Sequence, residues 1–473
     1  MKPRALALDA LRGYAIITMI LSGQMVLTHL PNWMAHAQVP PNMGFDPSIY
    51  GITWVDLVFP FFLFAMGAAF PFSIGRQIQQ GTSKLRLSLL AGWRGIQLVY
   101  FAIFFQHMKP FVISAQGSWQ SAVISLFAFA LLFFMFADLK NLFFTKTEFS
   151  IWIRNGVKCI AFALGFVLMY SLQYTGKKTP DFDVQFSDII IIVLANMAVF
   201  GACAYIFTYN KPLARIALLP FVMALFLSST NEGWVNHLFS YSPLPWAYKF
   251  YYLKYLFIVI PGSLAGEYLY TWLASASVPS TAKPSSAQAA SLAVLALALI
   301  VSNITFLYTR NLFINVILSL CLLLAMYKIL HVAKGSYADF WFNLFRAGSY
   351  LLLLGLSFEA FEGGIRKDPS TYSYYFVSSG LAFLALLFLS VVCDYFACNR
   401  STRFMIMSGQ NPMIAYVATA LVIMPVFALT HSNEWLVVFQ HGAWMGFLQG
   451  VLITSLAVLI TLFFTKIKWF WRT

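Results

Sequence analysis

Two stretches near the N-terminus, Leu8-Asp-Ala-Leu-Arg-Gly13 and Gly51-Ile-Thr-Trp-Val-Asp-Leu-Val-Phe-Pro-Phe-Phe-Leu-Phe-Ala-Met-Gly67, decide how this chain folds. Each belongs to a long apolar run, and a polar loop connects the two runs. Charged side chains are costly in hydrocarbon, so Asp9, Arg12 and Asp56 at the edges of these runs are candidates for function. The pattern predicts two membrane-spanning helices that form a pocket wall at one membrane face.

The rest of the chain repeats this apolar pattern. Of its 473 residues, 60% are hydrophobic and 10% are charged, whereas a soluble domain carries about 25% charged residues. Apolar runs of about 20 residues have the length of a transmembrane helix, and backbone groups in lipid must be satisfied within the segment. The sequence therefore predicts an all-α polytopic bundle of about 14 spans, within a range of 10–14, at residues 8–30, 52–75, 86–108, 119–138, 151–173, 187–208, 214–230, 252–274, 289–308, 311–330, 346–362, 374–396, 405–428 and 443–465.

The net charge of +14 comes from Lys and Arg that lie mostly in the loops between apolar runs. Such a distribution is typical of the positive-inside rule, so we expect a lipid bilayer and no nucleic acid as partner. The same bias predicts that the N- and C-termini are cytoplasmic. The five cysteines have no paired spacing and lie mostly in apolar runs, so the sequence predicts neither disulfides nor a metal site.

A Ser/Ala/Pro-rich segment at residues 275–288 interrupts the series of spans. This composition is typical of a flexible linker, here on the cytoplasmic side. We expect it to divide the chain into an N-terminal transmembrane half, 1–274, and a C-terminal transmembrane half, 289–473.

The loop between the first two spans carries candidate catalytic groups. Histidine is the usual side chain for proton transfer near neutral pH, which makes His36 a candidate base; the alternative is a surface histidine in a loop. Asp56 either orients a histidine or pairs with a cation, or is a helix-end carboxylate that reaches water.

A second group of candidates suits a phosphorylated ligand. Arg12, Arg76 and Arg94 would form a basic mouth at the cytoplasmic face, or each would extend its side chain to the interface. Asn411 precedes Pro412, which frees backbone hydrogen-bonding groups. It would either satisfy such groups or bind the ligand.

The stretch from Phe358 to Tyr375 is the densest polar segment near the outer face. Its two acids, two bases and cluster of tyrosines suit a sugar-like ligand, and the alternative is a charged loop beside an interfacial aromatic belt. The candidate substrate-binding residues are Glu359, Glu362, Arg366 and Lys367. In the eighth span, the glycine spacing of Pro261–Glu267 favours close helix packing, and Glu267 needs a partner.

The two N-terminal stretches resemble the membrane-bound heparan-α-glucosaminide N-acetyltransferase family, and most closely its uncharacterised bacterial branch. Segments at 261–267, 358–375 and 409–416 also resemble that branch, so the likeness covers most of the chain in patches. It implies a protein of the bacterial inner membrane that moves acetyl from cytosolic acetyl-CoA to an amino sugar or glycan on the outer side.

The resemblance also implies a catalytic histidine in the outer loop, assisted by an asparagine late in the first span. Without gaps, Asp46 stands at the histidine position and Gly23 at the asparagine position. His36, ten residues upstream of Asp46, would take over as base, with His29 or Asp46 as alternatives.

Three functions follow as hypotheses. The first is a membrane acyltransferase that uses acetyl-CoA as co-substrate and no metal. The second is a secondary transporter of a small sugar or sugar derivative, since intramembrane charges and broken helices suit transport. The third is a non-catalytic membrane scaffold. A homodimer is compatible with all three.

Overall fold

The computed structural model describes residues 5–138, 148–275, 283–440 and 442–471. In these ranges the chain is helical almost throughout, and its only β-pairing is an isolated bridge between Ala137 and Trp471. The all-α prediction is therefore confirmed. The chain is a multi-pass membrane protein, because thirteen of the described helical segments are long and apolar enough to cross a bilayer.

Most of the thirteen are single helices, and four include a short neighbouring segment. They are α1 (Leu6–Gln24), α2 (Trp54–Ala68) with the π-helical η3 (Pro71–Gly75) and α3 (Arg76–Gln79), α4 (Lys84–His107), α6 (Trp119–Phe136), α7 (Glu148–Ser171), α8 (Ile189–Phe207), η5 (Phe250–Tyr255) with α12 (Leu256–Ser275), α13 (Ser286–Tyr308), α14 (Leu312–Val332), α15 (Ser336–Phe361), α16 (Tyr372–Leu389) with η6 (Ser390–Tyr395), α18 (Pro412–Ala418) with η7 (Thr419–Ile423) and α19 (Met424–Leu429), and α21 (Ala443–Lys466).

Short helices lie between these spans: α5 (Pro110–Ile113), α9 (Pro212–Ile216), α10 (Leu218–Leu227), α11 (Trp234–Ser240), α17 (Asn399–Gln410) and α20 (Asn433–Leu436). The predicted seventh span, 214–230, corresponds to α9 and α10, which are interrupted at Ala217. The apolar segment Pro212–Leu227 is shorter than the thirteen long segments and is not one of them. Thirteen lies inside the predicted range of 10–14 spans.

The N-terminal stretch forms α1, which lies against α2, α17 and α21. A Cβ atom at Gly13 would lie 1.8 Å from the carbonyl oxygen of Met405, and one at Gly409 would lie 1.9 Å from that of Asp9. Glycine is therefore required at both crossing points, since any side chain would meet backbone. This close approach fixes α1, and with it Arg12, against the C-terminal part of the chain.

The second N-terminal stretch forms α2, whose start is closed by a capping box between Thr53 and Asp56. Helix α12 packs along α2 through the predicted glycines, because a Cβ at Gly262 or Gly266 would lie 2.2–2.3 Å from an α2 carbonyl oxygen. Glu267 has its partner in Arg215, at 2.8 Å.

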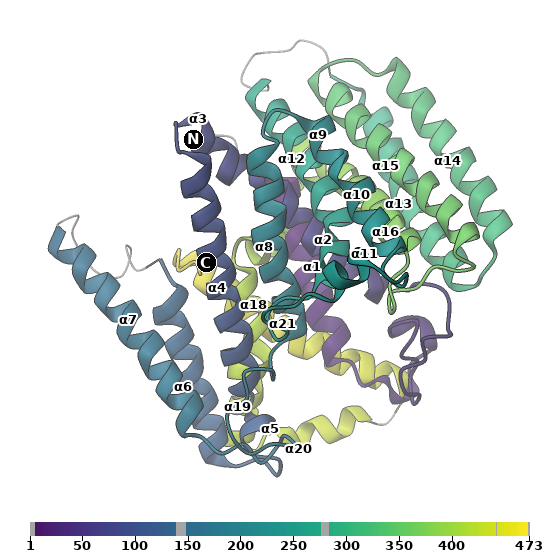
Figure 1. Ribbon diagram of the computed structural model, residues 1–473. Helices are drawn as coiled ribbons and strands as arrows, with labels where there is room; N and C mark the ends of the chain where they lie inside the picture. The colour runs from purple at the N-terminus through teal and green to yellow at the C-terminus, as the bar shows by residue number, and fades with distance from the viewer. Residues whose placement is uncertain (1–4, 139–147, 276–282, 441, 472–473) are drawn as a thin grey trace.

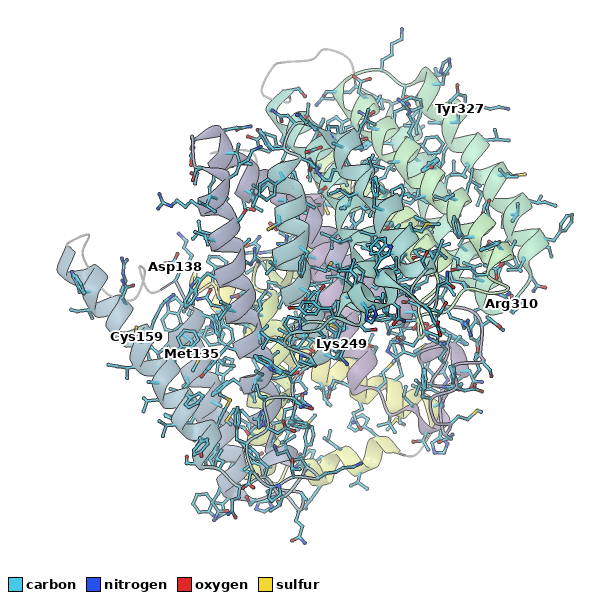
Figure 2. The ribbon with its side chains drawn as sticks, in the orientation of Figure 1. Met135, Asp138, Cys159, Lys249, Arg310 and Tyr327 are labelled. Atoms are coloured by element: carbon cyan, nitrogen blue, oxygen red, sulfur yellow. The ribbon has the colours of Figure 1, made fainter. Side chains whose placement is uncertain are left out.

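Figure 1 shows α13, α14 and α15 gathered on one side of the molecule and α6 and α7 on the other, with α1, α2, α8 and α18 between them. Arg310, in the turn between α13 and α14, and Tyr327 lie toward opposite ends of that outer group (Figure 2). Within the predicted linker 275–288, residues 276–282 lie outside the described residues, and Ser285 already caps α13. Helix α16 packs against α2 and α12, so the two predicted halves are in contact.

Candidate functional site

Two cavities and a narrow passage run along α1 and are enclosed mainly by α1, α2, α4, α8 and α18. The first, named here the Arg12 cavity, has a volume of about 430 Å3. The second, the Lys109 cavity, has a volume of about 540 Å3. Arg12 is near the N-terminal end of α1 and Gly23, which lines the second cavity, near its C-terminal end, so the cavities lie at opposite ends of that helix.

The passage between the cavities is apolar and has a volume of about 30 Å3. It shares Phe62, Leu98, Leu194, Pro412 and Met413 with the Arg12 cavity, and Met19, Ile190 and Tyr416 with the Lys109 cavity. Because of these shared walls, the three spaces follow one another through the bundle. The arrangement suits a long, thin ligand with a charged end.

The Arg12 cavity brings together two of the predicted phosphate-binding residues, Arg12 and Arg94, with Gln410 and the C-terminal Trp471. Arg12 and Asp9 share a helix face, as predicted, at 3.9 Å. The guanidinium of Arg12 also donates to the carbonyl oxygens of Gly409 and Ala65, at 3.3 and 3.4 Å. These contacts anchor the cation at the cavity wall.

The other two residues predicted for this site do not line the cavity. Arg76 is exposed on α3. Asn411 is fully buried and donates to the carbonyl oxygen of Trp469 at 2.8 Å, while its own oxygen accepts from the Trp471 backbone at 3.2 Å. Both ends of its amide hold the C-terminal segment in place, and this segment contributes Trp471 to the cavity. The backbone-satisfying alternative for Asn411 therefore describes the contacts observed.

The Lys109 cavity is mostly apolar, with polar side chains from Gln24, Lys109, Tyr416 and Thr419. Behind its wall, the Tyr416 hydroxyl lies 3.0 Å from both carboxylate oxygens of Asp188. The Lys109 ammonium lies 3.7 Å from the same carboxylate. Gly23 leaves open space, since no atom lies within 4 Å of a Cβ built there.

The predicted catalytic pair forms beside the start of α2. His36 Nδ1 lies 2.7 Å from Asp56 Oδ1, and the histidine side chain is 40% exposed. The Lys367 ammonium lies 3.1 Å from the same ring nitrogen and 3.8 Å from Asp56 Oδ1. A carboxylate only accepts and an ammonium only donates, so the 2.7 Å contact assigns the Nδ1 proton to a bond with Asp56. This tautomer leaves Nε2 as a proton acceptor, as in a catalytic histidine held by an aspartate.

Asp56 is held rigidly enough to orient that ring. Its side chain is 2% exposed, and its second oxygen accepts from the backbone of Thr53 at 2.9 Å and of Ala37 at 3.2 Å. The Tyr374 hydroxyl donates to the Asp56 carbonyl oxygen at 2.7 Å. Phe59, one turn further along α2, lines the passage. The histidine-orienting role predicted for Asp56 matches this geometry.

The remaining loop candidates are placed apart from this pair. His29 is exposed at the end of a short 3-10 turn. Asp46 accepts from the Ser48 hydroxyl and backbone at 2.6 and 2.8 Å, and these hydrogen bonds lower the pKa of its carboxyl below the usual value. A lowered pKa makes Asp46 a weaker base, and its contacts are those of a turn.

Of the four predicted sugar-binding residues, the structure brings only Lys367 to the catalytic pair. Glu359 is buried and pairs with Arg310 at 2.5 Å. Glu362 accepts from the backbone of Tyr372 and Ser373 at 2.7 and 2.8 Å, and so closes the start of α16. Arg366 donates to the Pro47 carbonyl oxygen at 3.1 Å. These contacts tie the 358–375 segment to its neighbours and to the His36 loop.

Sequence reasoning missed the polar wall of the Lys109 cavity. Lys109 follows the third span, Asp188 precedes a run of four isoleucines as a helix cap, and Tyr416 lies inside an apolar run. Each has an ordinary role in its own segment. The one signal in the sequence was a charged residue at the end of an apolar run, and such a residue does not indicate which other side chains it contacts.

Comparison with known proteins places the chain among relatives of unassigned function. No curated protein matches it. A family model described as a domain of unknown function, DUF5009, matches residues 4–269, which include α1, α2, α4 and α8 and therefore much of the wall of both cavities. Because this match covers more than half of the chain, the protein belongs to the DUF5009 family.

Proposed function

We propose that this protein is a membrane acyltransferase that takes an acyl group from acyl-CoA and passes it to an amino sugar or glycan at the opposite membrane face. The observation that carries the proposal is the series formed by the Arg12 cavity, the passage and the Lys109 cavity. Arginines suit the phosphates of CoA. The narrow apolar passage suits its thin pantetheine arm.

The length of the series supports the same ligand. Arg12 and Gly23 are eleven residues apart on α1, which is about 16 Å at 1.5 Å per residue. An extended pantetheine arm covers a distance of this order. The phosphates would then stay at the Arg12 cavity while the thioester reached the other end, and the two substrates would meet without either crossing the bilayer.

In this reaction His36 serves as the general base. Asp56 holds the ring so that Nε2 faces away from the carboxylate, and the exposed side chain is open to an acceptor from outside. A base of this kind contributes about 10²–10⁴-fold. The protein would lie in a bacterial inner membrane with cytoplasmic termini. Two termini at one face need an even number of crossings, so the shorter apolar segment Pro212–Leu227 would cross the bilayer in addition to the thirteen long segments. This orientation puts the Arg12 cavity at the cytosolic face, where acyl-CoA is found.

The test is a thermal-shift titration of the detergent-purified protein with acetyl-CoA, dephospho-CoA and glucosamine. A ligand at a hundredfold excess over its Kd stabilises by about 2.7 kcal/mol. We expect a shift with acetyl-CoA that weakens when the 3′-phosphate is removed and in an Arg94→Gln variant. Arg86→Gln is the matched control, because Arg86 lies exposed on the same helix and does not line the cavity.

A secondary transporter is the second candidate, and one observation favours it. Two cavities at opposite ends of α1 are separated by a constriction of about 30 Å3, and alternating access needs such a barrier. Uptake of a sugar into proteoliposomes without any acyl donor, together with no shift by acetyl-CoA, would replace the acyltransferase by the transporter.

A further inference from the structure

The polar wall of the Lys109 cavity is assembled from three helices that are distant in sequence. Lys109 follows α4, Asp188 caps the start of α8, and Tyr416 belongs to α18. The ammonium of Lys109 donates to Gln106 at 2.6 Å and lies 4.6 Å above the ring of Phe105. These contacts hold the charged end of the side chain at the cavity wall, where the side chain remains 17% exposed.

The charges of this wall compensate one another. Asp188 balances Lys109, and Tyr416 donates its hydroxyl to both oxygens of Asp188. The wall therefore presents a hydrogen-bond donor to the cavity, and the three side chains together carry no net charge. Such a site favours a neutral carbonyl oxygen over a free anion, and its donor becomes more valuable when that oxygen gains negative charge.

The lysine also lies where the proposed ligand would end. The Lys109 cavity is at the far end of the passage from the Arg12 cavity, and Tyr416 lines both the passage and the Lys109 cavity. A CoA thioester whose phosphates stay at Arg12 would present its carbonyl group at this wall.

We propose that Lys109 is a catalytic residue that donates a hydrogen bond to the thioester carbonyl oxygen, and that Asp188 and Tyr416 are its positioning residues. This inference rests on the proposed acyltransferase function. The acceptor nitrogen or oxygen forms a bond to the carbonyl carbon, and the carbon–sulfur bond breaks. His36 lines neither cavity, so the acceptor's proton passes to it through water, and a proton returns through solvent to the departing CoA thiolate. Lys109 keeps its own proton throughout.

The direct test is infrared spectroscopy of acetyl-CoA labelled with ¹³C at the thioester carbonyl, bound to the purified full-length protein. A hydrogen bond to a carbonyl oxygen weakens the C=O bond and lowers its stretching frequency. We expect a lowered frequency in the wild type and in Lys109→Arg, and a return toward the value in an apolar solvent in Lys109→Met. No acceptor has to be known for this measurement.

Kinetics supply the second readout once an acceptor is found. Removal of an oxyanion-type donor lowers kcat by about 10²–10³-fold, while the Kd for acetyl-CoA should stay within a few-fold of wild type. Lys178→Met is the matched control, because Lys178 is exposed and does not line the cavity. An unchanged carbonyl frequency in Lys109→Met, with acetyl-CoA still bound, would overturn the role of Lys109 and leave the acyltransferase proposal standing. Failure of acetyl-CoA to bind the wild type would overturn both.

Discussion

The imidazole of His36 makes one short hydrogen bond, and this bond determines which ring nitrogen is available for chemistry. With Nδ1 bound to Asp56 at 2.7 Å, Nε2 remains as the basic atom. Lys367 lies within 4 Å of both partners and stabilises the carboxylate as a charged group. The pair is therefore organised before any substrate arrives.

The first prediction tests this base. His36→Ala should lower kcat for acyl transfer by about 10²–10⁴-fold without changing acetyl-CoA affinity, since His36 lines neither cavity. The measurement is release of CoA thiol at saturating substrates. His29→Ala, in an exposed residue of the same loop, is the control and should behave as wild type. Full activity in His36→Ala would remove His36 from the mechanism.

The second prediction concerns the protonation of Lys109. Burial lowers the pKa of its ammonium, and the carboxylate of Asp188 opposes that shift. Lys109 therefore loses its proton, and its function as a donor, as the pH rises through a value below the ordinary lysine pKa of about 10.4. Activity and the lowered carbonyl frequency should decline together on this alkaline limb.

A Lys109→Arg variant separates this titration from others, because a guanidinium stays charged across the range. In this variant, the decline of activity and of the lowered carbonyl frequency at alkaline pH should move to higher pH. A decline at the same pH as in the wild type would show that another group titrates. Asp188 and Tyr416 are the titratable side chains within contact of this site among the described residues, and Tyr416→Phe tests the second of them.

At the scale of elements, glycine contacts set the separation between helices that carry functional residues. The contact of α1 with α17 through Gly13 and Gly409 leaves no room for a side chain. It holds Arg12 within hydrogen-bonding distance of the Gly409 carbonyl oxygen. The geometry of the Arg12 cavity therefore depends on backbone packing as well as on its charged residues.

The third prediction is that Gly409→Ala destabilises the protein and weakens acetyl-CoA binding together. Its Cβ would lie 1.9 Å from the Asp9 carbonyl oxygen, so α17 must move away from α1. Overpacking typically costs about 1–3 kcal/mol, and a clash with backbone is at the upper end. Thermal unfolding and the acetyl-CoA titration measure both effects.

Gly92→Ala is the control for that variant. Gly92 lies inside α4 with open space around a Cβ, so alanine should be neutral or stabilise the helix by up to about 1 kcal/mol. Equal melting temperatures for the two variants would contradict the account of the α1–α17 contact.

The same elements explain what sequence reasoning could predict. Long apolar runs predicted the helices, and the glycine spacing of 261–267 predicted close packing of α12, because both depend on local pattern; that the partner is α2 came from the structure. The predicted thirteenth span, 405–428, was wrong at its start, because α17 ends at Gln410 and the long apolar segment begins at Pro412. The sequence could not predict the wall formed by Lys109, Asp188 and Tyr416, because these residues belong to three separate segments that come together only through tertiary packing. Glu359 and Glu362 were assigned to a ligand because their partners, Arg310 and the start of α16, are also invisible in sequence.

At the scale of the whole molecule, the proposed acyl transfer depends on a path between groups at opposite ends of α1. The Arg12 cavity contains two arginines, and the Lys109 cavity has a lysine in a mostly apolar wall. The passage of about 30 Å3 joins them, and its walls come from five helices on both sides of the chain's midpoint. This is the reason why α18, from the C-terminal part, belongs to the same functional unit as the N-terminal spans.

The fourth prediction closes that path. Met413 lines both the passage and the Arg12 cavity, so Met413→Trp should fill the constriction. The phosphates of CoA would still dock, but the pantetheine arm would be excluded. We therefore expect the affinity for acetyl-CoA to fall to that of adenosine 3′,5′-bisphosphate, which lacks the arm, and acyl transfer to fall below detection.

Leu297→Trp, at a position 45% exposed on α13 and outside the passage, controls for added bulk. If Met413→Trp bound acetyl-CoA as tightly as wild type while folded to the same melting temperature, the acyl donor would not thread the bundle, and the reaction would have to take place at the Arg12 end.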